Sequence, residues 1–176
     1  MDYYSDKTNT PIGVTPRRIM EDNLNDCISF AENFNGKCKG LFMIGATGLG
    51  KTHLSLAIGN RVIEKGFCVA YGSVPEIIRK IDREQFGKAE GDTMGLAMES
   101  DLLILDDLGA ENRTDRAVSI LYEIINSRQN RGLPIIVNTN LEAKEIKNVY
   151  QDRLYSRLFS LKVLFFFGED NRLKNT

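Results

Sequence analysis

The sequence predicts an α/β fold in which helices sandwich a parallel sheet. Five short apolar runs supply the strands, and they are continuous rather than alternating, as is typical of strands buried on both faces. They lie at residues 41–44, 67–71, 102–105, 135–137 and 163–167. Segments of helical periodicity lie between them. Strand and helix in alternation indicate parallel pairing with right-handed crossovers.

Composition narrows the class of protein further. With 176 residues the chain is one domain in length, and 23 basic against 24 acidic residues exclude a polybasic binder. A membrane span needs about 20 apolar residues, and the longest runs here have about five, so we expect no contact with a membrane. Three cysteines without CxxC spacing, and no signal peptide, predict reduced thiols and a cytoplasmic location.

The first helix follows a polar arm. Residues 1–14 have the composition of a linker or a poorly ordered arm. Thr15 and Pro16 then supply an N-cap and a proline at the first helical position. Apolar residues follow at helical spacing as far as Phe34, and Asn35-Gly36 ends the helix.

A complete phosphate-binding loop joins the first strand to the next helix. It matches G-x-x-x-x-G-K-[ST] and consists of Gly45, Ala46, Thr47, Gly48, Leu49, Gly50, Lys51 and Thr52. Glycines let successive N–H groups surround phosphates, and the helix start adds its positive dipole end. We expect Lys51 to reach the outer phosphates of a nucleotide and Thr52 to bind Mg²⁺. The next residue, His53, is the last of the candidate nucleotide contacts. We expect it to have a structural rather than a catalytic role.

Two carboxylates end the third strand. Because carboxyl ends of parallel strands open onto the ligand crevice, Asp106 and Asp107 are expected beside the phosphate loop. Asp106 suits the Mg²⁺ shell, and Asp107 is placed to polarise an attacking water. The alternative is a pair of solvated turn carboxylates.

The fourth strand ends in amides instead of acids. Asn138 or Asn140 could orient water against a γ-phosphate, and Asn138 is favoured because it lies nearer the strand core. Both could equally cap the helix that begins near Leu141.

Arginines follow in the last helix and after the last strand. Arg153 and Arg157 stand at i and i+4, where they could pair with Asp152 or act on a neighbouring subunit. Arg172 follows the last strand and, from spacing alone, is a surface residue.

These motifs together resemble the AAA+ ATPase domain of the DnaC/DnaI helicase-loader family, which shares its core with the IstB transposition helpers. GATGLGKTHL, LLILDDLGAE, INSRQNRGLPIIVNTN and DRLYSRL carry the resemblance, over roughly residues 15–176. It implies a P-loop NTPase with a five-stranded sheet in the order 5-1-4-3-2. It also implies an arm and leading helix at 1–38 and an ATPase core at 39–176.

The resemblance assigns further roles within this ATPase core. Asn138 corresponds to sensor 1, Arg157 to the arginine finger with Arg153 as second choice, and Arg172 to sensor 2. Two departures matter: only a short arm stands where loaders carry a helicase-binding domain, and Asp107 stands where many relatives have Glu. The shorter side chain predicts slow hydrolysis.

The segment from Val74 to Met98 resembles the initiator-type insertion that contacts single-stranded DNA. Cations and an aromatic ring suit such a groove, and here they are Arg79, Lys80, Arg83, Lys88 and Phe86. The alternative is a solvated amphipathic helix with Ile77, Ile78 and Ile81 inward. Arg113 and Arg116 form a second candidate for DNA contact.

The resemblance implies a magnesium-dependent ATPase that assembles as a homo-oligomer through its ATP sites. Its partners would be a replicative hexameric DnaB-type helicase and single-stranded DNA. Alternatives are a transposition helper on duplex DNA and a nucleotide-binding switch with little turnover. A small-molecule kinase is disfavoured because the chain has no evident arginine-rich lid.

Overall fold

The computed structural model describes residue 10 and residues 13–168, and it contains six helices and five strands in that part of the chain. In chain order they are α1 (Pro16–Glu32), β1 (Leu41–Gly45), α2 (Lys51–Glu64), β2 (Val69–Ser73), α3 (Val74–Gln85), α4 (Thr93–Glu99), β3 (Leu102–Leu108), α5 (Asp115–Asn130), β4 (Ile135–Thr139), α6 (Ala143–Phe159) and β5 (Lys162–Phe166). Among the described helices, none has the length and apolar character to cross a bilayer.

All five strands pair in parallel, in the order β2-β3-β4-β1-β5. This is the 5-1-4-3-2 order and it confirms the predicted sheet. The order places β1 in contact with β4 and β5, and β3 in contact with β2 and β4. The carboxyl ends of β1, β3 and β4 therefore meet at one edge of the sheet, where the sequence placed its candidate site.

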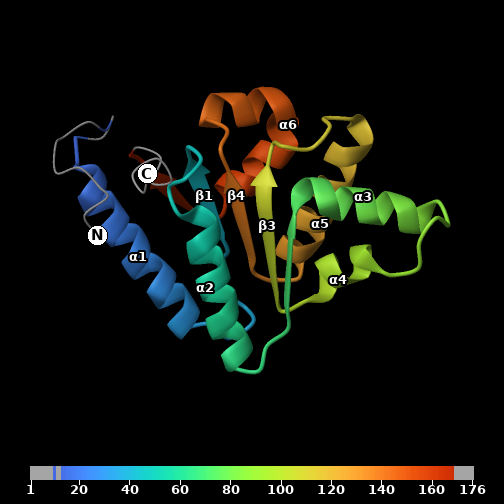
Figure 1. Cartoon of the computed structure of the whole chain (residues 1–176), viewed down its shortest axis with the longest axis horizontal. Coiled ribbons are helices and arrows are strands. Elements are labelled where there is room, and N and C mark those ends of the chain that lie inside the picture. Colours follow the sequence, from blue (N-terminus) through green and yellow to red (C-terminus); the bar gives the residue numbers. More distant parts are fainter. Residues whose placement is uncertain (1–9, 11–12, 169–176) are drawn as a thin grey trace, which may run out of the picture.

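Helices cover both faces of the sheet. One buried cluster joins α1 and α2 to one face through residues such as Cys27, Ile58 and Met43. The other cluster joins the opposite face to α3, α5 and α6 through residues such as Ile81, Leu121 and Tyr150. Figure 1 shows α1 and α2 running together on one side, with α3 and α4 projecting on the other.

The second strand lies two residues later than the sequence predicted, and it is only partly buried. The apolar run at 67–71 predicted a strand buried on both faces, but β2 is Val69–Ser73 and lies at the edge of the sheet. Phe67 lies between the preceding turn and the strand, and its ring packs edge-on against Phe34 at a centroid distance of 5.0 Å. An edge position leaves Tyr71 half exposed.

The leading helix is fixed to the last strand. Thr15 caps α1 by accepting a hydrogen bond from the backbone N–H of Arg18, as predicted. The buried amide of Asn23 donates to the carbonyl oxygen of Phe165 at 2.8 Å, and Lys162 pairs with Asp26 at 2.6 Å. The predicted arm at 1–14 falls largely outside the described residues.

The segment between β2 and β3 is a two-helix insertion. Ile77, Ile78 and Ile81 of α3 are buried against the sheet, as the amphipathic alternative required. The two helices are joined at their ends by Glu84, whose carboxylate accepts from the backbone N–H and the hydroxyl of Thr93 at 2.7 and 2.6 Å. The insertion is therefore a folded part of the domain.

One buried arginine connects the amino ends of β3 and β4. Arg128 on α5 is fully buried, and its guanidinium donates to the carbonyl oxygens of Ala97 and Pro134 and to the Ser100 hydroxyl. Burial lowers the pKa of Arg128 to about 10, so the side chain remains charged near neutral pH. A guanidinium carries five N–H donors spread over a planar fork that reaches these separate acceptors, whereas an ammonium offers three donors from a single point.

We expect Arg128→Lys to lower the free energy of unfolding by about 2 kcal/mol or more, since buried carbonyls lose their donors. Urea denaturation measures this change. Arg131→Lys is the matched control, because Arg131 is exposed one turn later and should change stability by less than about 0.5 kcal/mol. Equal stabilities of the two variants would contradict the role given to Arg128.

Candidate nucleotide-binding site

The phosphate loop occupies the tight connection between β1 and α2. Gly48 and Gly50 have φ values of 80° and 88°, a left-handed conformation that side-chain-bearing residues rarely adopt. Gly45 is required for a different reason: a Cβ there would lie 2.5 Å from the carbonyl oxygen of Phe166 on β5. The loop can therefore curl toward the start of α2 only with glycine at these positions.

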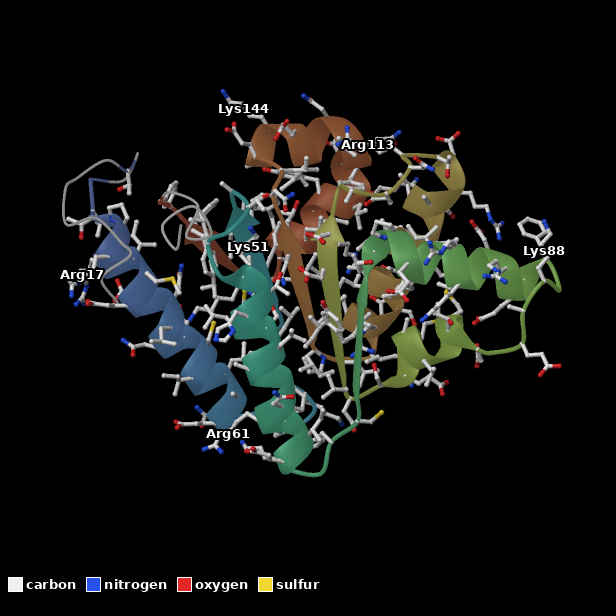
Figure 2. All side chains as sticks on the ribbon, in the orientation of Figure 1. Arg17, Lys51, Arg61, Lys88, Arg113 and Lys144 are labelled. Atoms are coloured by element: carbon white, nitrogen blue, oxygen red, sulfur yellow. The ribbon has the colours of Figure 1, made fainter. Side chains whose placement is uncertain are left out.

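Lys51 is folded over this loop. Its ammonium donates to the carbonyl oxygens of Gly45 and Ala46 at 2.6 and 2.8 Å, and the residue is only 6% exposed. Figure 2 shows Lys51 at the loop end of α2. A buried cation beside the N-terminus of a 14-residue helix makes this end of the molecule strongly attractive to anions.

Asp106 is 4% exposed and accepts hydrogen bonds from the polar groups beside the loop. We call Asp106 and these donors the Asp106 hub. Its Oδ1 accepts from the Thr52 hydroxyl at 3.2 Å and from the Asn138 amide at 3.0 Å. The backbone N–H of Asp107 donates to the same oxygen at 3.1 Å. The structure thus brings together three residues that the sequence placed in one site: Thr52, Asp106 and Asn138.

The fourth donor to Asp106 was missed by the sequence analysis. The Tyr71 hydroxyl on β2 donates to Oδ2 at 3.3 Å. The pKa of Tyr71 is raised mainly by its partial burial and next by the negative charge of Asp106. Only the pairing of β2 with β3, which places Ser73 opposite Asp106, brings this tyrosine to the site.

A bulge at the end of β3 separates the two adjacent aspartates. The β3–β4 register shifts between Leu105 and Leu108, and Asp107 has a φ of 56°. Bulges re-aim side chains, and here Asp106 is buried while Asp107 is exposed. The side chain of Asp107, for which the sequence predicted a water-polarising role, is therefore exposed to solvent beside Asp106.

Asn138 is buried and does not cap the following helix. The Ser55 hydroxyl lies 3.0 Å from Asn138 Oδ1 and 3.0 Å from the Lys51 carbonyl oxygen. The last helix, α6, is instead capped by Glu142, which forms a capping box with Glu145. The capping alternative is therefore wrong for Asn138, and Asn140 is exposed.

A buried carboxylate lies just beyond the hub, and the sequence analysis gave it no role. Glu111 accepts from the backbone N–H of Gly109 at 2.8 Å and from the Tyr150 hydroxyl. Burial and the hydrogen bond to Glu111 raise the pKa of Tyr150. The next residue, Gln151, has φ 56° and ψ 179°, which interrupts α6. The loop after β3 is thereby tied to the helix that carries the arginine-finger candidates.

The candidate arginines lie apart. Arg153 is exposed and lines a cavity of about 300 Å³ together with Arg113 and Tyr150. Arg157 is half-buried and lines a separate cavity of about 390 Å³ with Gly40 and Leu161, which precede β1 and β5. Neither pairs with Asp152, whose carboxylate lies 3.6 Å from Lys147. Arg172 lies outside the described residues.

The two candidates for DNA contact meet at Arg116 of α5, which reaches Phe86 of the insertion. Phe86, at the end of α3, is 63% exposed, and the guanidinium carbon of Arg116 lies 5.1 Å from its ring centroid. The ammonium of Lys88 lies 5.9 Å from the same ring. Arg116 is held there by Asp82, at 2.6 Å. We call Phe86, Lys88 and Arg116 the aromatic–basic cluster, and Figure 2 shows Lys88 at the outer end of the insertion.

Two further basic residues of these candidates make contacts outside the cluster. Lys80 pairs with Glu76 along α3 at 3.1 Å, and Arg113 donates to the carbonyl oxygen of Gly109 at 3.4 Å. His53 is exposed on the first turn of α2.

The hub has the donor set that Mg²⁺ prefers. Mg²⁺ binds through one or two carboxylates and substrate phosphates and keeps several waters. Asp106 and the Thr52 hydroxyl offer adjacent oxygens beside the phosphate loop. Within residues 13–168, no group of three or more His, Cys, Asp or Glu side chains is arranged to hold a metal ion.

Comparison with known proteins places this geometry in a family. The replicative helicase loader DnaI of Bacillus subtilis is 29% identical over 122 residues, which cover 68% of this chain and 39% of DnaI. The replicative helicase loader DnaC of Escherichia coli is 25% identical over 138 residues, covering 77% of this chain and 56% of DnaC. The chain thus spans about half the length of these relatives.

The fold is shared with solved helicase-loader structures. A crystal structure of the DnaC helicase loader superimposes with a TM-score of 0.78 at 24% identity, over 85% of this chain and 90% of that one. The model of the IstB-like ATP binding proteins matches residues 15–160. This range contains the phosphate loop, the Asp106 hub and both candidate arginines of α6. The chain therefore belongs to the family of IstB-like ATP binding proteins.

Proposed function

We propose that this chain binds ATP with Mg²⁺ at the phosphate loop, hydrolyses it slowly, and acts in loading a replicative hexameric helicase onto single-stranded DNA. The observation that carries the ATPase part is the buried Asp106 hub beside a complete phosphate loop. Lys51 would exchange the loop carbonyls for the outer phosphates, because a charge-assisted bond to phosphate is stronger than one to a neutral carbonyl.

Each residue around the γ-phosphate has a separate role in this proposal. Thr52 and Asp106 would hold Mg²⁺, which would supply positive charge beside the phosphate oxygens. Asp107 accepts a proton from the attacking water, and Asn138 orients that water or the γ-phosphate. Asp107 is one methylene shorter than the glutamate of many relatives, which favours slow turnover.

Arg157 acts in a neighbouring subunit. Arg157, with Arg153 as second choice, would reach the γ-phosphate bound by the next copy in a homo-oligomer, and Arg172 would contact its own nucleotide. Arg157 lines a cavity at the amino ends of β1 and β5, away from its own phosphate loop, as suits a residue that acts in trans. ATP would then stabilise an assembly that ADP does not.

The aromatic–basic cluster supports single-stranded DNA as the nucleic acid partner. An exposed ring flanked by two cations offers a base a stacking face and its phosphates a positive field. The relatives DnaI and DnaC are named replicative helicase loaders, which favours a DnaB-type helicase as the protein partner. A transposition helper on duplex DNA is the second candidate, favoured by the match to the IstB-like family.

We expect Asp107→Asn to lower the steady-state ATPase rate by about 100-fold or more, because a general base is lost, while nucleotide affinity changes little. Asparagine keeps the size of the side chain and tolerates the positive φ at this position. Phosphate release and nucleotide titration measure the two quantities. Asp115→Asn, on the exposed start of α5, is the control. Undiminished turnover in Asp107→Asn would remove Asp107 from the chemistry.

Fluorescence anisotropy with labelled single-stranded and duplex DNA, each with an ATP analogue or ADP, tests the proposed function. We expect tighter binding to single strands with the ATP analogue, and Phe86→Ala should weaken it by about 1–3 kcal/mol. Leu96→Ala is the matched control, because Leu96 is a 61% exposed apolar residue of the same insertion. A preference for duplex DNA would favour the transposition helper, and absence of binding in both nucleotide states would refute the DNA-loading role.

A further inference from the structure

The two carboxylate oxygens of Asp106 accept different numbers of hydrogen bonds. Oδ1 accepts three hydrogen bonds, from Thr52, Asn138 and the Asp107 backbone. Oδ2 accepts one described hydrogen bond, from Tyr71 at 3.3 Å. Each carboxylate oxygen has about two lone pairs, so the three donors to Oδ1 share its two, whereas Tyr71 uses one of the two on Oδ2. The position still available to a metal or a metal-bound water is therefore on Oδ2, the oxygen that Tyr71 contacts.

Tyr71 reaches this oxygen from the edge of the sheet. It lies on β2 opposite Ile104 of β3, and it is 50% exposed, so its ring contributes little to the core. Two of the donors to Oδ1 come from other elements, α2 and β4, and the third from the backbone of β3 itself. Tyr71 alone among the described donors restrains the other end of the carboxylate.

We propose that Tyr71 is a positioning residue for magnesium: its hydroxyl fixes the plane of the Asp106 carboxylate and leaves one lone pair of Oδ2 for the metal or its water. This inference rests on the proposed function. Groups that hydrogen-bond a metal-ligating side chain orient it, and their loss typically lowers metal affinity by about 10–100-fold. The three donors to Oδ1 remain without Tyr71, so we expect an effect near the lower end.

A purely structural role would have a different signature. A hydrogen bond from a half-exposed phenol contributes little to the free energy of unfolding, because water replaces it. A structural tyrosine would change nucleotide affinity equally with and without magnesium. A positioning tyrosine changes only the magnesium-dependent part.

The test is the substitution Tyr71→Phe, which removes the hydroxyl and keeps the ring. Affinity for a fluorescent ATP analogue is measured in EDTA and across a magnesium titration, with urea unfolding as the check on folding. We expect about a tenfold rise in the magnesium concentration at half-saturation and less than a twofold change in the affinity measured in EDTA. Tyr122→Phe, on α5, is the matched control and should equal the wild type.

An unchanged or tighter magnesium response in Tyr71→Phe would overturn the inference, and so would an equal loss with and without magnesium. These outcomes leave the proposed function standing as long as the wild-type chain binds nucleotide in a magnesium-dependent way. Absence of magnesium-dependent binding in the wild type would instead refute the proposed function.

Discussion

A buried carboxylate is the constraint on which the site depends. Moving a charged group out of water is costly unless hydrogen bonds replace its hydration, and Asp106 is almost fully buried. Its four donors come from α2, β2, β3 and β4. The two most distant donors in the sequence, Thr52 and Asn138, are 86 residues apart. These partners can meet only when β3 lies between β2 and β4, and β4 beside β1. The order of the strands therefore determines which residues meet at the candidate magnesium site.

The nucleotide site and the aromatic–basic cluster are joined by short segments of chain. β2, which carries Tyr71, continues directly into α3, and α3 ends at the cluster residue Phe86. On the other side, the loop after Asp107 leads through Glu111 to α5, whose first turn carries Arg116. The Asp82–Arg116 ion pair connects α3 to α5. Two routes therefore link Asp106 to the surface proposed to hold DNA: one begins with the Tyr71 hydrogen bond and continues through β2 and α3, and the other follows the chain from Asp107 to α5.

Local patterns predicted much of the site, and long-range pairing decided the rest. The phosphate loop, the strand before it and the acidic end of β3 follow from residue types at fixed spacing, and the structure places Thr52, Asp106 and Asn138 together. The sheet order came from the family resemblance, because spacing alone does not determine which strands are neighbours. Tyr71 and the Glu111–Tyr150 pair were missed because no local motif marks them, and their partners lie 35 and 39 residues away. The edge position of β2 likewise explains why a continuous apolar run gave a half-exposed strand.

We propose that the buried Asp106 converts the phosphate-binding loop into a site for magnesium and nucleotide together. Isothermal titration calorimetry of Asp106→Asn with a non-hydrolysable ATP analogue, in magnesium and in EDTA, tests it most directly. Asparagine keeps the shape and removes the charge, so we predict that affinity in EDTA stays near the wild-type value while the gain from magnesium falls by about tenfold or more. A variant that keeps the full wild-type gain from magnesium would contradict the claim.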